Sequence, residues 1–194
     1  VAAGSLLVTE AGGLRQHGLH GAGLGVGCFG IGQRLSNGEL VGISMAHQAE
    51  IFRQHRELGP GVRELTFART DEKPLTFAAG QWLNLDLTPT PGELRRAYSI
   101  ASAPNGTGTF ELAVTRVEGG PGSTKLHALA PGDTVTCTGP QGIFYRKELG
   151  PSLFVATGTG FTPLRSMIHD ALAKGDTSPM RLVFGVRRPE DRIY

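Results

Sequence analysis

The segment "RRAYSIAS", residues 95–102, contains side chains that could bind a phosphorylated, planar ligand. In a strand its side chains alternate, so Arg96, Tyr98, Ile100 and Ser102 would share one face. A guanidinium group binds phosphate, a tyrosine ring packs on a flat heterocycle, and the Ser99 hydroxyl could donate to a ring nitrogen. This combination favours a phosphorylated flavin. The alternative is an edge strand with an incidental arginine, tyrosine and serines.

A second candidate site is "GGPGST", residues 119–124, which precedes a predicted helix. Glycines allow a ligand to approach the backbone closely, and free N–H groups with the helix dipole attract phosphate. Gly122, Ser123 and Thr124 are therefore candidate phosphate-binding residues. The helix is expected to be capped at Ser123 or Thr124 and to stop at residues 131–132. The alternative is an ordinary capped helix after a flexible loop.

The third motif is "VATGTGFTP", residues 155–163, an apolar strand followed by a glycine turn and a helix start. Open α/β sheets hold the pyrophosphate of a dinucleotide at such a turn. The candidate residues are Gly158, Thr159, Gly160 and Pro163. The motif differs from G-x-G-x-x-G because Pro163 stands at the position of the third glycine. The alternative is that the glycines only turn the strand into the helix.

The elements that would carry the first two motifs are short strands separated by turns, from about residue 51 to residue 140. Within residues 81–88 the alternation places Leu83, Leu85 and Leu87 on one face. We therefore expect a small antiparallel barrel or sandwich. The clearest strands cover residues 62–69, 81–88, 96–102, 109–117 and 134–142.

The pattern changes near residue 151. Residues 152–157 and 180–186 read as apolar strands, and residues 162–175 between them read as an amphipathic helix. This βαβ unit is the start of a parallel sheet. Because the chain stops at Tyr194 after two such strands, we expect an incomplete nucleotide-binding domain.

Composition indicates an ordinary globular protein of 194 residues, with 39% hydrophobic and 19% charged residues. A net charge of +2 gives no argument for nucleic acid as a partner, and the apolar runs are too short to span a membrane. The two cysteines, Cys28 and Cys137, lie far apart and form no metal-binding spacing. We expect a soluble, cytoplasmic protein in which Cys137 is a small buried apolar residue.

Taken in order, the motifs RxYSxxS, GGxGS, GPxG, ATGTGxxP and FGVRRPED resemble the ferredoxin–NADP reductase superfamily. The likeness covers about residues 49–194 and is strongest to the bacterial oxygenase-reductase and flavohaemoglobin-reductase branches. It implies an antiparallel six-stranded Greek-key flavin-binding barrel, followed by the start of a Rossmann-like nucleotide domain. The implied division is a glycine-rich region at 1–48, the barrel at 49–148 and a partial NAD(P)-binding domain at 149–194.

The resemblance also implies roles for the flavin site. Arg96 would contact the flavin phosphate, Tyr98 would pack on the isoalloxazine ring, and Ser99 would lie near its reactive N5 atom. Tyr98 and Ser99 are thus the candidate catalytic residues. Gly122 and Ser123, with Thr124 beside them, would hold the pyrophosphate.

For the nucleotide, the resemblance implies that the turn at 158–160 and Pro163 bind the phosphates of the dinucleotide. Gly185 and Arg187 would lie on the adenosine side. Arg187 and Arg188 could pair with the 2′-phosphate of NADPH, but Glu190 and Asp191 follow closely, which favours NADH.

The implied function is that of a flavin-dependent oxidoreductase. Hydride would pass from NADH or NADPH to FAD, or to FMN, and electrons would then pass singly to an iron–sulfur or haem protein. No metal site is expected in the chain itself. One alternative is a non-catalytic flavin-binding remnant, and another is an electron-transfer subunit whose flavin is reduced by a partner.

Within the glycine-rich region at 1–48, residues 23–40 weakly resemble the cluster-binding loop of a plant-type ferredoxin and the strand that follows it, with Cys28 at the second ligand position. Gly23 and Ile31 stand where the outer thiolates of C-x4-C-x2-C belong, so a [2Fe–2S] cluster is not expected. Residues 1–48 are interpreted as a degraded or partial ferredoxin-like region, or as unrelated to ferredoxin. The nearby histidines are interpreted as solvated rather than as zinc ligands. They are His17, His20 and His47.

Overall fold

The computed structural model describes residues 33–34, 40–41, 48–90 and 92–194. The interpretations that concern Cys28 and the three histidines before residue 48 lie outside the described residues. The elements are β1 Gln33–Arg34, β2 Leu40–Val41, β3 Gln48–Gly59, β4 Val62–Arg69, β5 Trp82–Asp86, β6 Arg95–Ser99, β7 Thr109–Thr115, α1 Pro121–His127, β8 Thr134–Gln141, β9 Ser152–Thr157, η1 Gly158–Gly160, α2 Phe161–Ala173, β10 Met180–Gly185 and η2 Pro189–Asp191.

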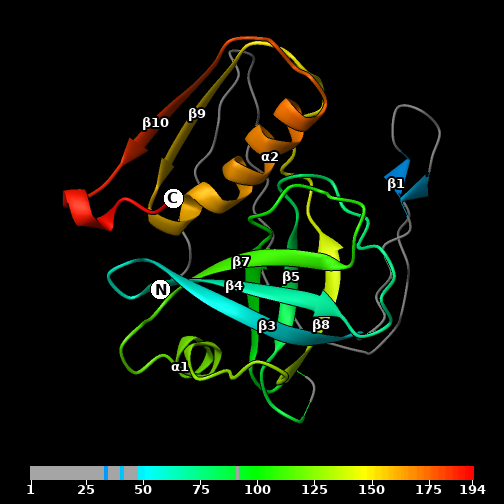
Figure 1. The fold of residues 1–194 in the computed structure, drawn as a ribbon, viewed down its shortest axis with the longest axis vertical. Coiled ribbons are helices and arrows are strands. Elements are labelled where there is room, and N and C mark those ends of the chain that lie inside the picture. The colour runs from blue at the N-terminus through cyan, green and yellow to red at the C-terminus, as the bar shows by residue number, and fades with distance from the viewer. Residues whose placement is uncertain (1–32, 35–39, 42–47, 91) are drawn as a thin grey trace, which may run out of the picture.

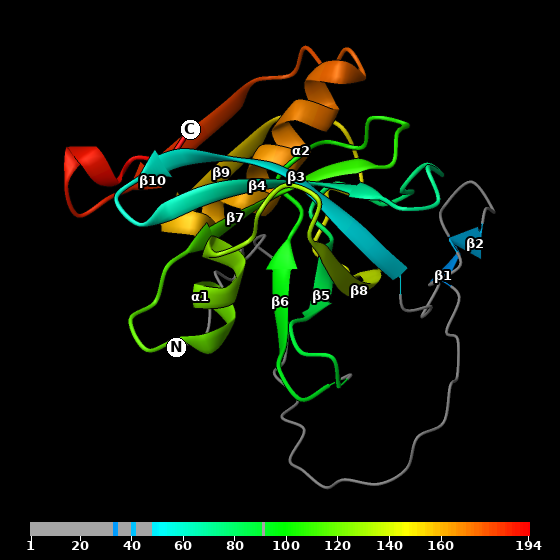
Figure 2. The same cartoon turned by 60° about the horizontal axis from the view of Figure 1, so that its bottom comes forward.

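Six of these strands form one antiparallel sheet in the order β6-β5-β8-β3-β4-β7. The sheet coils until its two edges meet, because Ile100, just beyond β6, bridges to Leu112 of β7. Figures 1 and 2 show the resulting barrel, with α1 beside it. The predicted six-stranded antiparallel barrel is confirmed.

The barrel core follows from strand alternation. Leu83, Leu85 and Leu87 are all at most 1% exposed, as their spacing predicted. The rings of Phe52, Phe67 and Phe110 pack in sequence across β3, β4 and β7, with centroids 5.7 and 5.6 Å apart. Such offset and edge contacts add to the stabilisation from burial.

Strand β3 is difficult to predict from the sequence, because most of its twelve residues are polar. It still pairs with β4 and β8, and its inward positions Glu50 and Phe52 are fully buried. The strand therefore supplies both a core ring and a buried carboxyl group.

Helix α1 differs from its predicted boundaries. It begins at Pro121, with Gly120 as its N-cap and no capping side chain, and it ends at His127. The prediction that Ser123 or Thr124 caps the helix is wrong. The Ser123 hydroxyl accepts the Val117 N–H at 3.0 Å and donates to the Gly120 carbonyl at 3.1 Å. Proline is well suited to the first helical turn, since its missing N–H would have no partner there.

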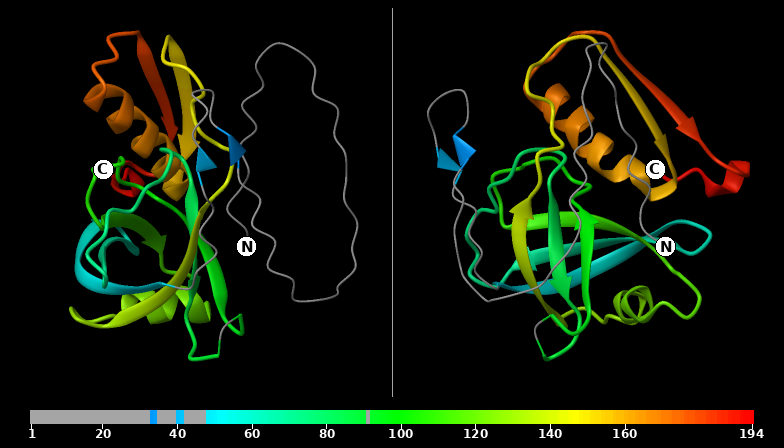
Figure 3. Two further views of the ribbon diagram at one scale, coloured as in Figure 1. Left: turned by 90° about the vertical axis from the view of Figure 1, so that its right-hand side faces the viewer. Right: turned by 180° about the vertical axis from the view of Figure 1, so that it is seen from behind.

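The predicted βαβ unit is confirmed. Strands β9 and β10 are parallel and in register from Ser152 with Met180 to Thr157 with Gly185. Helix α2 covers one face of this pair, with Phe154, Ala156 and Met167 in the shared core. Figure 3 shows the unit standing at one end of the barrel, opposite α1. No helix in the described ranges is long and apolar enough to cross a membrane.

Candidate functional site

The register of β5 and β6 decides which faces the first motif presents. Arg96 pairs with Leu85 and Tyr98 with Leu83, and both leucines are fully buried. Paired residues of antiparallel strands project to the same face, so Arg96 and Tyr98 both lie on the inner side of the sheet edge. Ser99 pairs with Trp82 on the other face.

Arg96 lies directly beside the start of α1. A Cβ atom placed on Gly122 would be 2.9 Å from Cγ and 3.6 Å from Nε of Arg96. The Arg96 side chain is exposed, and its Nη1 donates to the Arg95 carbonyl at 2.8 Å. The two predicted phosphate-binding segments are therefore brought together, and glycine at 122 is what lets them meet.

The neighbouring arginine has a different role. Arg95 donates from Nε to Oδ1 of Asp86 at 2.8 Å and from Nη2 to Oδ2 at 3.1 Å. Asp86 is buried, and it also accepts the Gly92 N–H at 3.0 Å. This bidentate ion pair fastens β6 to β5 and so holds Arg96 in place.

Helix α1 is held at its far end as well. Arg63 of β4 donates to the His127 carbonyl at 2.8 Å, and Nε2 of His127 lies 3.0 Å from the Val114 carbonyl oxygen. A cation beside the last carbonyls is favourable for a helix. These contacts fix the helix to β4 and β7, with its glycine end beside Arg96.

Tyr98 is half-buried at the edge of the barrel core. Burial raises the pKa of its phenol, and the positive charge of Arg96 partly opposes this increase. The hydroxyl of Ser99 makes no hydrogen bond to the described part of the chain, and the residue is half-buried. A neutral aromatic ring and an available hydroxyl thus stand on consecutive residues.

The glycine turn after β9 is open. Gly158 has φ of +50°, and a Cβ at Gly158 or Gly160 would meet nothing within 4 Å. The Thr159 carbonyl accepts the Thr162 hydroxyl at 2.8 Å, which fixes the turn at the start of α2. Pro163 is buried in α2, so its ring packs inside the protein.

The end of β10 lies beside this turn. Gly185 pairs with Thr157, because the two strands are parallel and end at the same edge. Arg187 follows Gly185 and is exposed. The predicted nucleotide residues before and after α2 are thus gathered at one edge, where open α/β sheets bind ligands.

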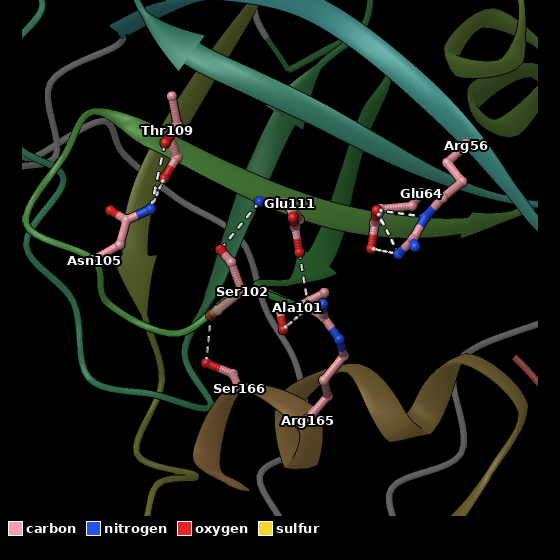
Figure 4. A network of polar contacts seen from close by, with 9 residues as sticks. All are labelled: Arg56, Glu64, Ala101, Ser102, Asn105, Thr109, Glu111, Arg165 and Ser166. Atoms are coloured by element: carbon pink, nitrogen blue, oxygen red, sulfur yellow. Dashed lines mark hydrogen bonds and ion pairs between the residues drawn. The ribbon is translucent and has the colours of Figure 1, made fainter. Parts of the chain in front are cut away.

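Two residues that sequence reasoning missed join this unit to the barrel. Arg165 and Ser166 of α2 donate to the carbonyls of Ala101 and Ser102, the residues that continue β6 (Figure 4). The position of Ser166 on the apolar face of the helix was a signal of such a contact, because a buried serine needs a hydrogen-bond partner, and Ser166 is fully buried. The partner could not be read from the sequence.

Two family profiles match the chain. Residues 51–145 match the oxidoreductase FAD-binding domain, and residues 154–194 match the oxidoreductase NAD-binding domain. The first range includes β6 and α1, and the second includes the glycine turn and both parallel strands.

Similar proteins include a ferredoxin–NADP reductase B of Sorangium cellulosum, 54% identical over 153 residues, which are 76% of this chain and 63% of that protein. The ferredoxin–NAD(P)(+) reductase component of the naphthalene 1,2-dioxygenase and salicylate 5-hydroxylase systems of Ralstonia is 38% identical over 63% of this chain and 37% of its own.

Among solved structures, the cytochrome P450 reductase GcoB of Amycolatopsis superposes with a TM-score of 0.67 and 31% identity. The match covers 76% of this chain and 45% of GcoB. The chain therefore spans less than two thirds of the length of each of these three proteins.

Proposed function

Because the chain belongs to the ferredoxin–NADP reductase superfamily, we propose that it is a flavin-dependent oxidoreductase that uses NAD(P)H. In this proposal it takes electrons from the reduced nicotinamide through FAD and passes them to a protein acceptor with an iron–sulfur cluster or a haem. The observation that carries the proposal is the meeting of Arg96 with Gly122, on the same face as Tyr98.

The residues present fit FAD. The Arg96 guanidinium is exposed, and the absence of a side chain at Gly122 lets the first turn of α1 pack directly against Arg96. Arg96 and the N–H groups at the start of α1 would hold the pyrophosphate. The Ser123 hydroxyl is engaged with Val117 and Gly120, so Ser123 would contribute its backbone N–H, and exposed Thr124 would lie at the rim.

At the reactive end, Tyr98 would pack on the isoalloxazine ring and exclude water from one side. Ser99 would donate its free hydroxyl toward the ring nitrogen N5. Bound FAD supplies the redox chemistry, accepting two electrons as hydride and releasing them singly, while these side chains orient the ring.

The nucleotide would bind across the carboxyl ends of β9 and β10. Open glycines at 158 and 160 let phosphate oxygens approach the backbone, and Thr159 completes the turn. Pro163 would shape the turn from within α2, while Gly185 and Arg187 would border the adenosine. We favour NADH because Glu190 and Asp191 of η2 follow Arg187 closely and would repel a 2′-phosphate.

The partner is proposed from the chemistry of the relatives. The Sorangium protein is named for ferredoxin and GcoB is named as a cytochrome P450 reductase, so both an iron–sulfur and a haem acceptor have a precedent. The corresponding domain division is a flavin-binding barrel at 49–148 and a nucleotide-binding part at 149–194. Residues 1–48 would be the glycine-rich region, of degraded or partial ferredoxin-like sequence or unrelated to ferredoxin.

The test is the anaerobic visible absorption spectrum of the purified protein, before and after NADH is added. We expect a flavin spectrum that bleaches with NADH. A flavin spectrum that NADH leaves unchanged would instead support a flavin-binding remnant or a subunit reduced by its partner. A colourless protein that does not take up added FAD would contradict the flavin site at Arg96 and Tyr98.

A further inference from the structure

We propose that Arg165 and Ser166 form a latch that sets the angle between the nucleotide-binding unit and the flavin barrel, and that they are positioning residues for hydride transfer. This inference rests on the proposed function. The latch is defined by these two side chains of α2 and their two acceptor carbonyls, at Ala101 and Ser102.

The first half of the latch is an arginine with two acceptors. Nη1 of Arg165 lies 2.8 Å from the Ala101 carbonyl oxygen and 2.8 Å from Oε2 of Glu111. The Arg165 side chain is 14% exposed and that of Glu111 29% exposed. Partial exclusion of water strengthens such a charge-assisted contact relative to a surface ion pair.

An aromatic ring covers the other side of this guanidinium. The carbon Cζ of Arg165 lies 4.3 Å from the centroid of the Tyr194 ring, which itself makes an edge contact with Phe161 of α2 at 6.1 Å. Cation–π packing therefore limits the rotamers of Arg165 and keeps its donors directed at the barrel.

The second half of the latch is Ser166. Its side chain is fully buried, and its hydroxyl donates to the Ser102 carbonyl at 2.7 Å. Because a buried hydroxyl without a partner is costly, this bond selects one docking position of α2.

The segment that receives both bonds is itself tied to the barrel. The Ala101 N–H donates to the Glu111 carbonyl at 2.7 Å, and the Glu111 N–H donates to the Ser102 hydroxyl at 3.1 Å. The backbone of Glu111 thus bonds to residues 101–102, and its carboxylate accepts from Arg165 (Figure 4). Helix α2 is consequently hydrogen-bonded to a segment that β7 holds in place.

The position of this segment connects the latch to the reaction. Ala101 and Ser102 directly continue the strand that carries Tyr98 and Ser99, while the opposite end of the latch is the helix that follows the glycine turn. In the proposed reaction NADH is oxidised and the flavin is reduced by one hydride, which carries the electron pair. A displacement near 1 Å of the two units would slow that transfer by as much as about a hundredfold.

The latch is tested first by a distance measurement that needs no cofactor. Spin labels at Gln54→Cys on β3 and Ala173→Cys at the end of α2 report the separation of the two units, in a Cys28→Ser background. Cys137 resists labelling because it is buried, and burial raises the pKa of its thiol. We expect a narrow distance distribution that broadens with Arg165→Ala or Ser166→Ala and becomes narrow again with Arg165→Lys, which keeps a donor.

The second measurement is the rate of flavin reduction on rapid mixing with saturating NADH. Arg165→Ala should lower this rate about tenfold or more without changing flavin occupancy, and Arg165→Lys should restore most of it. The matched control is Arg181→Ala, which removes an exposed arginine of β10 and should change neither readout.

An unchanged distance distribution in both latch variants would overturn the inference, as would a broadened distribution with an unchanged reduction rate. If Arg165→Ala loses its flavin or unfolds at a lower urea concentration than the unmodified protein, the distance distributions and reduction rates of Ser166→Ala and Arg165→Lys test the inference instead. Failure of the unmodified protein to be reduced by NADH would refute the proposed function, whereas the distance measurements would still judge the latch.

Discussion

A Cβ atom on Gly122 would lie only 2.9 Å from Cγ of Arg96, so the first turn of α1 packs against the Arg96 side chain of β6. The same hypothetical Cβ would lie 3.2 Å from Cδ1 of Leu87. Position 122 therefore has room for glycine alone while Arg96 keeps this conformation. The contact joins the two motifs from which a flavin site was predicted.

The role of Arg96 can be measured by substitution. Arg96→Ala should weaken FAD binding by about 1.5–3 kcal/mol, or roughly tenfold to a hundredfold, because a charge-assisted phosphate contact is lost. Stability of the apoprotein should change little, since the side chain is exposed. Fluorescence titration of the apoprotein with FAD gives the affinity. The control is Arg53→Ala, an exposed arginine of β3, and equal affinities for all three proteins would exclude the phosphate role.

A side chain at position 122 should weaken FAD binding in the same way as the loss of Arg96. Gly122→Ala is expected to lower FAD affinity about tenfold, or about 1.4 kcal/mol, because a Cβ atom 2.9 Å from Cγ of Arg96 would push the exposed arginine out of its phosphate-binding conformation. Because alanine favours helices, the free energy of unfolding should not fall by a comparable amount. If the substitution acts through Arg96, its effect on affinity should disappear in the Arg96→Ala background. Full additivity of the two substitutions would contradict this mechanism.

Glu50 should make stability depend on pH. The Glu50 side chain is fully buried, and Oε2 has no hydrogen-bond partner among the described residues. Within the same residues, the one hydrogen bond to this carboxyl group is a long one of 3.6 Å, from Sγ of Cys137 to Oε1. Burial raises the pKa of Glu50 from 4.5 to about 7, although that bond and the charge of Arg69 oppose the increase.

The direction of this dependence follows from which state binds the proton. Between pH 4.5 and pH 7 the folded protein keeps the Glu50 proton while the unfolded chain releases it, so stability falls as pH rises. We expect the free energy of unfolding in urea to fall by about 3 kcal/mol across this range, relative to Glu50→Gln, which cannot titrate. Parallel pH profiles for the two proteins would show that Glu50 is not the cause.

Nucleotide preference tests the end of β10. The protein should be reduced by NADH at lower concentrations than by NADPH. Arg187→Ala should raise the KM for both nucleotides by similar factors, since the shared part of the adenosine would be the group it contacts. Steady-state reduction of ferricyanide with each nucleotide gives these values. A selective loss of NADPH use by more than about tenfold, or 1.4 kcal/mol, would instead assign Arg187 to the 2′-phosphate.

Local patterning predicted much of this molecule. The strand at 62–69 was found with the predicted bounds, and the apolar face of β5 and the βαβ unit were found where alternation and helical periodicity placed them. Each of these features leaves a regular period of apolar side chains along the chain, so residue order alone reveals it. The predicted start of α1 was too late, because the Ser123 hydroxyl bonds to the preceding loop instead of capping the helix. Helix boundaries are the part of an element that sequence locates least exactly.

By itself, the sequence determined which residue types are available for binding: the arginine, tyrosine and serine of β6, and the glycines of two helix starts. The tertiary structure decided which of them meet. The closure of the barrel placed Ile100 beside Leu112, the fixed position of α1 brought Gly122 to Arg96, and the docking of α2 set Ser166 on Ser102. Each of these contacts joins segments distant in the chain, and their geometry follows from sheet twist and core packing rather than from any local pattern.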